Sequence, residues 1–167
     1  RKLESEKKDM ELQFLKSQLN PHFLFNSLNN IYSLAYQKSD KTADAILKLS
    51  EIMRYMIYES NAATVPLARE MAYMKDYISL QQLRYKNSPV VDLEIDRETE
   101  ASHIAPLLLI HLLENAYKHS PARLEPGDIK VKVGIDKDVL TFSVQNPIGH
   151  NPANTLDAPG GIGLPNV

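Results

Sequence analysis

Apolar residues recur with a helical period through the first part of the chain. The range from residue 2 to about residue 37 is predicted to be helical, with Leu15 and Leu19 on its apolar stripe. Asn20 and Pro21 interrupt this range, because proline lacks a backbone N–H and its ring clashes with the carbonyl four residues earlier. We therefore expect either a restarted helix with Asn20 as its N-cap or a kinked continuous helix.

A second helix is predicted over residues 41–59, with Ser39 or Asp40 as its N-cap. Its apolar residues follow one another at spacings of three and four and form a narrow seam, which consists of Ile46, Leu49, Met53 and Met56. Two antiparallel helices with such narrow seams bury little area alone. We therefore expect this helical hairpin to pair with a second copy in a four-helix bundle, as a homodimer.

The rest of the chain mixes helix and strand patterns. After a linker at residues 60–64, a third helix is predicted from Val65 and Pro66 to about residues 86–89. Apolar and polar residues then alternate with the period of a strand over three ranges, 91–95, 129–133 and 139–144. The last two ranges should form an antiparallel hairpin, so the fold class is predicted to be α+β.

Between the first strand and the hairpin, residues 106–119 form a predicted helix that is apolar except along one line. That line holds His111, Asn115 and then Lys118 or His119, at helical spacing. A nearly apolar helix is buried, so its polar stripe must face a cavity or a partner. A plain core helix would explain the leucines but would leave Asn115 without a partner.

Composition narrows the classes of function. The chain of 167 residues is 43% hydrophobic, which is enough for folded cores, and we expect two domains, at 1–62 and 63–167. The net charge of −2 is spread over residues of both signs, so neither nucleic acid nor direct membrane contact is expected. The absence of cysteine excludes a disulfide scaffold and suits a reducing cytoplasm. Because the chain starts without Met or a signal sequence, we expect a cytoplasmic fragment of a longer protein.

The segment from Asn20 to Asn26 carries the first candidate chemistry. A lone helical histidine usually has no chemical task, but His22 stands in the run Asn-Pro-His-Phe-Leu-Phe-Asn. This run resembles the phosphoacceptor motif of the sensor histidine kinases that are paired with LytTR-type response regulators. The resemblance implies that His22 accepts the γ-phosphoryl group of ATP and passes it to an aspartate of the regulator. It also implies a parent protein in the inner or plasma membrane.

Residues 112–119, Leu-Leu-Glu-Asn-Ala-Tyr-Lys-His, resemble the N-box of the GHKL ATPase superfamily. The resemblance implies an α/β sandwich that binds ATP, with Asn115 as a ligand of Mg²⁺. Lys118 and His119 match positions that approach phosphate or ribose. An amide oxygen suits Mg²⁺, which otherwise keeps water and phosphate oxygens as ligands.

Residues 160–164 resemble the second glycine box of the same superfamily. Glycines there let backbone N–H groups approach phosphate oxygens, so the resemblance assigns Gly161, Gly163 and Leu164 to nucleotide binding. The aperiodic stretch 147–159 stands where the family has its mobile ATP lid. The chain stops before the last helix and strand of that fold, so we expect the ATPase domain to be truncated.

The sequence departs from the family pattern at several positions. Asn146 stands where an Asp commonly binds the adenine amino group, although its carbonyl oxygen could accept the same hydrogen bond. His111 replaces a Glu or Asn found in many members. Phe23 replaces the acidic residue that follows the histidine in other kinase classes, which makes Asn26 the candidate for orienting the ring or a hydrolytic water. Arg54 is a weaker candidate for meeting phosphate.

Two functions therefore stay open. The first is autophosphorylation of His22 with ATP and Mg²⁺, for which a largely neutral imidazole needs no strong base. The alternative is a dimeric phosphotransfer scaffold, a pseudokinase that no longer binds nucleotide, which the altered residues 145–147 favour.

Overall fold

A computed structural model of the chain describes residues 2–18, 20–86, 88–96 and 102–149. Its helices are α1 (Lys2–Gln18), α2 (Pro21–Tyr36), α3 (Thr42–Ile57), the 3₁₀ turn η1 (Glu59–Asn61), α4 (Leu67–Gln82) and α5 (Leu108–His119). Its strands are β1 (Val65–Pro66), β2 (Val91–Ile95), β3 (His103–Ile104), β4 (Ile129–Asp136) and β5 (Val139–Gln145). Within these described ranges, no helix has both the length and the apolar character needed to cross a membrane.

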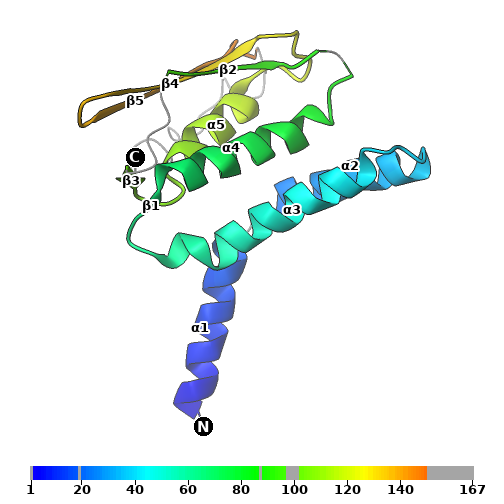
Figure 1. The fold of residues 1–167 in the computed structure, drawn as a ribbon. Coiled ribbons are helices and arrows are strands. Elements are labelled where there is room, and N and C mark those ends of the chain that lie inside the picture. Colours follow the sequence, from blue (N-terminus) through cyan, green and yellow to red (C-terminus); the bar gives the residue numbers. More distant parts are fainter. Residues whose placement is uncertain (1, 19, 87, 97–101, 150–167) are drawn as a thin grey trace, which may run out of the picture.

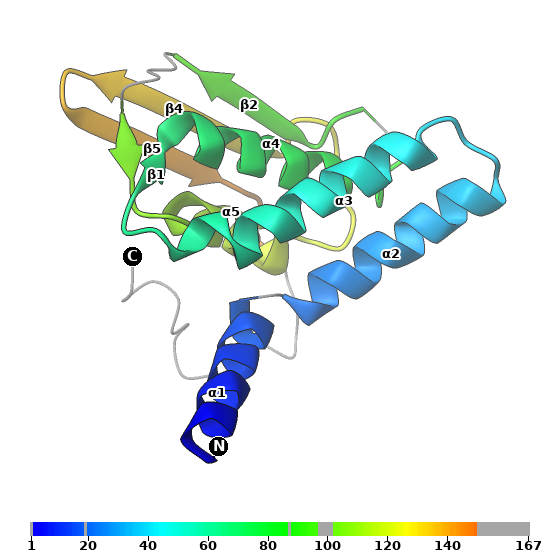
Figure 2. The ribbon, with the colours of Figure 1, turned by 60° about the horizontal axis from the view of Figure 1, so that its bottom comes forward.

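The helical pattern at the start of the chain is interrupted by a restart and not by a kink. Asn20 is the N-cap of α2, and its side-chain oxygen accepts a hydrogen bond from the backbone N–H of Phe23 at 3.1 Å. Pro21 takes the first helical position, where its missing N–H costs nothing. As a result, α1 and α2 are separate helices, and α1 projects away from the rest of the molecule (Figures 1 and 2).

Helices α2 and α3 form the expected antiparallel hairpin (Figure 2). The prediction that Ser39 or Asp40 caps the second helix is wrong, because α3 begins one residue later and its N-cap is Lys41. Ser39 closes the connecting turn instead. Its carbonyl oxygen accepts from the hydroxyl of Thr42 at 2.9 Å, and its own hydroxyl accepts from the Lys41 N–H at 3.3 Å.

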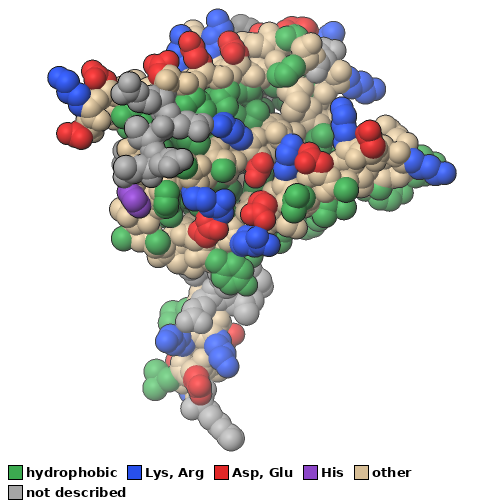
Figure 3. Space-filling view, viewed as in Figure 1, with side chains coloured by type: hydrophobic (Ala, Val, Ile, Leu, Met, Phe, Trp, Pro, Cys, Tyr) green, Lys and Arg blue, Asp and Glu red, His purple; other side chains and the backbone are tan. Residues whose placement is uncertain are grey.

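Helix α3 lies along α4 and turns a different face inward than its narrow seam suggested (Figures 1 and 2). Leu49 and Met56 of the seam are buried, but Ile46 is 51% exposed, while Ile52 and Tyr55 are buried. The side of α3 that faces α4 therefore packs into the core of this chain. Large apolar side chains remain exposed on the hairpin, namely Phe25, Leu28, Tyr32, Tyr36, Ile46 and Leu47. Figure 3 shows hydrophobic side chains along one edge of this helical hairpin, with charged side chains of both signs over the rest of the visible face.

The larger sheet has the strand order β2-β4-β5 and confirms the predicted hairpin. β4 and β5 are antiparallel, and β2 runs parallel to β4 with Val91 opposite Ile129. Helices α4 and α5 cover one face of this sheet (Figure 1), where the alternate apolar residues of β4 are buried. The other face is polar.

Helix α4 begins later than the sequence suggested, and its first turn fixes the start of α5. Val65 and Pro66 are extended and pair with β3, so the helix starts at Leu67. One turn on, the buried carboxylate of Glu70 accepts a hydrogen bond from the backbone N–H of Leu107. Leu107 has a left-handed backbone, with φ of 62°, and directly precedes α5. Buried apolar residues from α2 to β4 belong to one cluster.

Candidate functional site

An aromatic contact positions the first turn of α2 against the second half of the chain. Phe23 is only 5% exposed, and its ring stacks on that of Tyr77 in α4 with centroids 4.7 Å apart. Tyr77 in turn meets the ring of Tyr117 in α5 edge-on, at 6.0 Å. His22, the residue before Phe23, is exposed, so anchoring Phe23 directs the neighbouring imidazole along the surface of α4 and α5.

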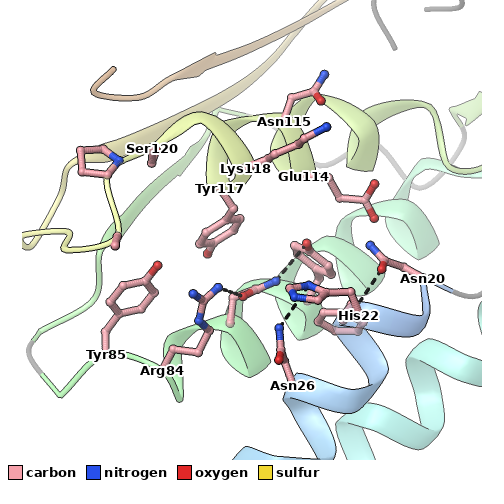
Figure 4. A pocket seen from close by; sticks show the side chains of 15 residues that line it. Asn20, His22, Asn26, Arg84, Tyr85, Glu114, Asn115, Tyr117, Lys118 and Ser120 are labelled. Atoms are coloured by element: carbon pink, nitrogen blue, oxygen red, sulfur yellow. Dashed lines mark hydrogen bonds between the residues drawn. The ribbon is translucent and has the colours of Figure 1, made fainter. Parts of the chain in front are cut away.

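His22 and Asn115 line one cavity of about 700 Å³. Its polar and charged residues with possible chemical roles come from α2, from α5 and from the turn after α4, and they are His22, Asn26, Arg84, Glu114, Asn115 and Lys118. Figure 4 shows the side chains of α5 on one side of this space and those of α2 on another. His22 of α2 and Asn115 of α5, which come from distant segments of the same chain, therefore line a common cavity.

The imidazole of His22 is held from its own helix. Its Nδ1 lies 3.2 Å from the side-chain nitrogen of Asn26, one helical turn further on (Figure 4). The O and N atoms of an amide exchange places when the group turns over, so the same contact serves either ring tautomer. Asn26 therefore holds the orientation of the ring, whichever ring nitrogen carries the proton.

The remaining predicted residues have mixed outcomes. Lys118 lines the cavity, whereas His119 and Asn146 do not, and the Asn146 amide donates to the carbonyl of Pro147 at 2.9 Å. Arg54 forms an ion pair with Glu51 on its own helix at 2.8 Å and is not a cavity residue. The nucleotide-binding residues expected near the C-terminus, Gly161, Gly163 and Leu164, lie outside the described residues, as does most of the expected lid. Their roles stay predictions.

Two charged residues of the cavity were not singled out from the sequence. Glu114 lies next to the predicted Mg²⁺ ligand, and its carboxylate oxygen is 3.7 Å from Nδ1 of His111. The nearby carboxylate of Glu114 raises the pKa of His111, because it stabilises the protonated ring. Adjacency to Asn115 in the N-box could have indicated Glu114. Arg84 stands in a segment, residues 65–85, that resembles the lead-in to the ATPase domain of the same family, but this resemblance assigned it no role.

The donor set suits a magnesium ion that arrives with a polyphosphate. Asn115 offers one neutral oxygen ligand, and Mg²⁺ usually takes only one or two ligands from protein when phosphates are present. Lys118 and Arg84 add two positive charges to the same walls, which oppose the charge of a polyanion. Within the described ranges, no group of three or more His, Cys, Asp or Glu side chains gathers around a common point.

Comparison with known proteins gives one consistent result. The family model for histidine kinases matches residues 10–89. The chain is 34% identical to the sensor protein LytS of Staphylococcus epidermidis over 154 residues, which is 92% of this chain and 26% of that protein. It is 36% identical to LytS of Bacillus subtilis over 113 residues, 68% of this chain and 19% of that protein. For LytS of Enterococcus faecalis the identity is 32% over 138 residues, 82% of this chain and 23% of that protein.

The chain thus spans about a quarter of the length of the curated relatives it matches. The family match covers α2, α3 and α4, and the longer alignments extend the similarity to most of the chain. The chain therefore belongs to the sensor histidine kinases, in the class of the LytS proteins.

Proposed function

We propose that the chain is the cytoplasmic catalytic region of a two-component sensor histidine kinase whose parent protein resides in a membrane. His22 accepts the γ-phosphoryl group of ATP and then passes it to an aspartate of a response regulator of the LytTR type. The observation that best supports this proposal is the cavity shared by His22 and Asn115. Residues 1–62 are the proposed dimerisation and phosphotransfer domain, and residues 63–167 the proposed GHKL-type ATP-binding domain.

The proposed nucleotide site is built around α5. Asn115 is the ligand of Mg²⁺, with Lys118 beside it in the cavity wall. When bound, ATP with Mg²⁺ supplies a phosphoryl group whose charge the metal ion partly neutralises. The other proposed nucleotide contacts, whose placement the cavity does not test, are His119, Asn146, Gly161, Gly163 and Leu164.

The proposed reaction needs one unprotonated ring nitrogen on His22. If the amide of Asn26 accepts a hydrogen bond from Nδ1–H, the lone pair is on Nε2, which is then the nucleophile. The N–P bond forms from this lone pair while the bond from the γ-phosphorus to the bridging oxygen breaks, and ADP leaves with that electron pair. Asn26 acts here as a positioning residue, and alignment of the ring supplies much of the rate.

The proposed active species is a homodimer in which transfer occurs within one subunit. The exposed residues Phe25, Leu28, Tyr32 and Tyr36 recur at helical spacing along α2 and form an apolar stripe. Pairing of this stripe with the same stripe of a second copy would complete a four-helix bundle. The cavity with His22 and Asn115 lies within one chain, which favours transfer inside a subunit.

The test is phosphorylation with ATP labelled at the γ-phosphate. The wild-type protein should acquire label in a bond that is labile in acid and stable in base, and His22→Gln should abolish it. Asn115→Asp should also abolish labelling, with the far-UV circular dichroism spectrum unchanged. Label that survives His22→Gln would place the acceptor on another residue.

A binding experiment separates the kinase from the scaffold alternative. A titration of the full-length protein with Mg·ATP should show saturable binding that Asn115→Asp weakens. Absence of binding at millimolar nucleotide, together with phosphorylation of His22 only by an exogenous donor, would establish the scaffold instead.

A further inference from the structure

Arg84 has no part in the reaction described so far, although its side chain lines the same cavity as His22 and Asn115. It lies just beyond the end of α4, in a turn that two backbone hydrogen bonds define. The N–H of Arg84 donates to the carbonyl of Gln81 at 3.2 Å, and that of Tyr85 donates to the carbonyl of Gln82 at 3.0 Å. The position of the arginine backbone is therefore fixed by the helix end.

The guanidinium group of Arg84 is directed into the cavity (Figure 4). It lies between Tyr85, whose ring centroid is 5.8 Å from its Cζ, and Gln81, whose side-chain oxygen is 3.5 Å from its Nη1. Gln81 donates in turn to the hydroxyl of Tyr77 at 3.0 Å. The ring of Tyr77 stacks on Phe23, so the turn that carries Arg84 and the turn that carries His22 share an anchor.

Arg84 is an exposed residue at the wall of this cavity, and its charge reaches the tyrosine hydroxyls beside it. Burial raises the pKa of both Tyr77 and Tyr117, and the positive charge of Arg84 opposes that rise at each hydroxyl. In the part of the chain that the structure describes, Arg84 forms no ion pair with a carboxylate. Glu114, in the same cavity, lies 3.7 Å from His111. A guanidinium without an anionic partner, held at the wall of a cavity, is a ready site for an anion.

We propose that Arg84 contacts the phosphoryl group during its transfer to His22 and is a catalytic residue of the reaction. This inference rests on the proposed function. A planar guanidinium donates two parallel hydrogen bonds to phosphoryl oxygens, and it stabilises the charge that spreads over those oxygens in the transition state. The proposed contact of Arg84 is with the transferred phosphoryl group. Binding of the nucleotide itself is assigned to other residues, among them Asn115 and Lys118 on α5.

The first test compares Arg84→Gln, Arg84→Lys and the control Arg123→Gln in single-turnover autophosphorylation. Arg123 follows the end of α5, its side chain is 89% exposed, and it does not line the cavity of His22. Arg84→Gln should lower the first-order rate by about 10²- to 10³-fold with little change in the dissociation constant of Mg·ATP. The rate of Arg84→Lys should lie between those of Arg84→Gln and the wild type, since an ammonium group is only a point charge. Arg123→Gln should match the wild type.

The second test removes the nucleotide and uses phosphoramidate as the phosphoryl donor. In this reaction the N–P bond of phosphoramidate breaks, ammonia leaves, and the ring nitrogen of His22 forms the new N–P bond. Because no nucleotide is present, a residue that only binds ATP has no effect here. Arg84→Gln should slow this labelling of His22 as well, and Arg123→Gln should not.

The outcomes separate this inference from the proposed function. If the wild type is not labelled by ATP, the proposed function fails, and the phosphoramidate reaction still tests Arg84. If the wild type is labelled and Arg84→Gln is labelled equally fast in both reactions, the role of Arg84 is overturned. A loss confined to the affinity for Mg·ATP also overturns it. Should Arg84→Gln fail to fold by circular dichroism, wild-type rates in a folded Arg84→Lys protein would contradict the inference.

Discussion

The position of His22 depends on the contact between the rings of Phe23 and Tyr77. Truncation of the Phe23 side chain is therefore the sharpest test of the site. The ring is almost fully buried and lies against Tyr77 at 4.7 Å, with an interplanar angle of 26°. Truncation of a buried Phe to Ala costs about 3–5 kcal/mol when the cavity does not refill. Here the loss falls mainly on the contact between the start of α2 and the helices α4 and α5.

A loss of about 3 kcal/mol in that contact lowers the ratio of docked to undocked helix by roughly 10²-fold. We therefore expect Phe23→Ala to reduce the rate of autophosphorylation by up to about 10²-fold, with the affinity for Mg·ATP unchanged. Phe23→Leu keeps an apolar side chain and loses only the stacking, which is worth about 0.5–1.5 kcal/mol. Its rate should fall only about 3- to 10-fold.

The measurement is single-turnover labelling from γ-labelled ATP, with circular dichroism to confirm folding. A double-mutant cycle with Phe23→Leu and Tyr77→Leu should show a coupling of about 0.5–1.5 kcal/mol between the two rings. If folded Phe23→Ala is labelled within about twofold of the wild type, or if the two losses add without coupling, the docking role of this pair is refuted.

Three further predictions concern other parts of the molecule. Burial raises the pKa of Glu70, so its stabilising contribution is complete below its ordinary pKa and is lost as the pH rises through the folded-state value. Glu70→Gln keeps an acceptor for the Leu107 N–H, and in urea titrations it should gain stability relative to the wild type as the pH is raised above the ordinary pKa of a glutamate carboxyl. In mixed dimers of His22→Gln with Asn115→Asp, transfer within a subunit predicts no labelling, whereas appreciable labelling would mean transfer between subunits. A charge in the apolar stripe of α2, as in Tyr32→Lys, should shift the protein from dimer to monomer in light scattering, without changing its helix content.

The elements themselves could be predicted from the sequence because their signals are local. The strand at 91–95 and the hairpin with its turn near residue 137 match the structure, since alternation reports directly on which residues face a sheet. The polar line on α5 correctly indicated a cavity for Asn115 and Lys118, although His111 and His119 do not line it. The predicted N-cap of α3 was wrong because Ser39 can form hydrogen bonds either with the N-terminus of a helix or within the turn that contains it. The sequence does not say which of the two occurs.

The faces that meet could not be predicted in the same way. An apolar residue at helical spacing is expected to be buried, but its spacing does not say against what. On α3 both Ile46 and Ile52 have apolar side chains, and only the approach of α4 decides that Ile52 is the buried one. Arg84 was missed for a related reason, because a charged residue at a helix end ordinarily faces solvent. Only the turn after α4 brings it to the same cavity as His22.

The helical geometry around His22 explains why Phe23 and Asn26 cannot exchange roles. Successive residues of a helix point about 100° apart, while residues four positions apart share a side. Phe23 therefore faces the rings of α4, and Asn26 lies beside the imidazole at the cavity. A Phe23→Glu substitution would consequently not supply a base to His22. It would bury a carboxylate against Tyr77, which is 3% exposed, and so weaken the contact that presents the imidazole to α5.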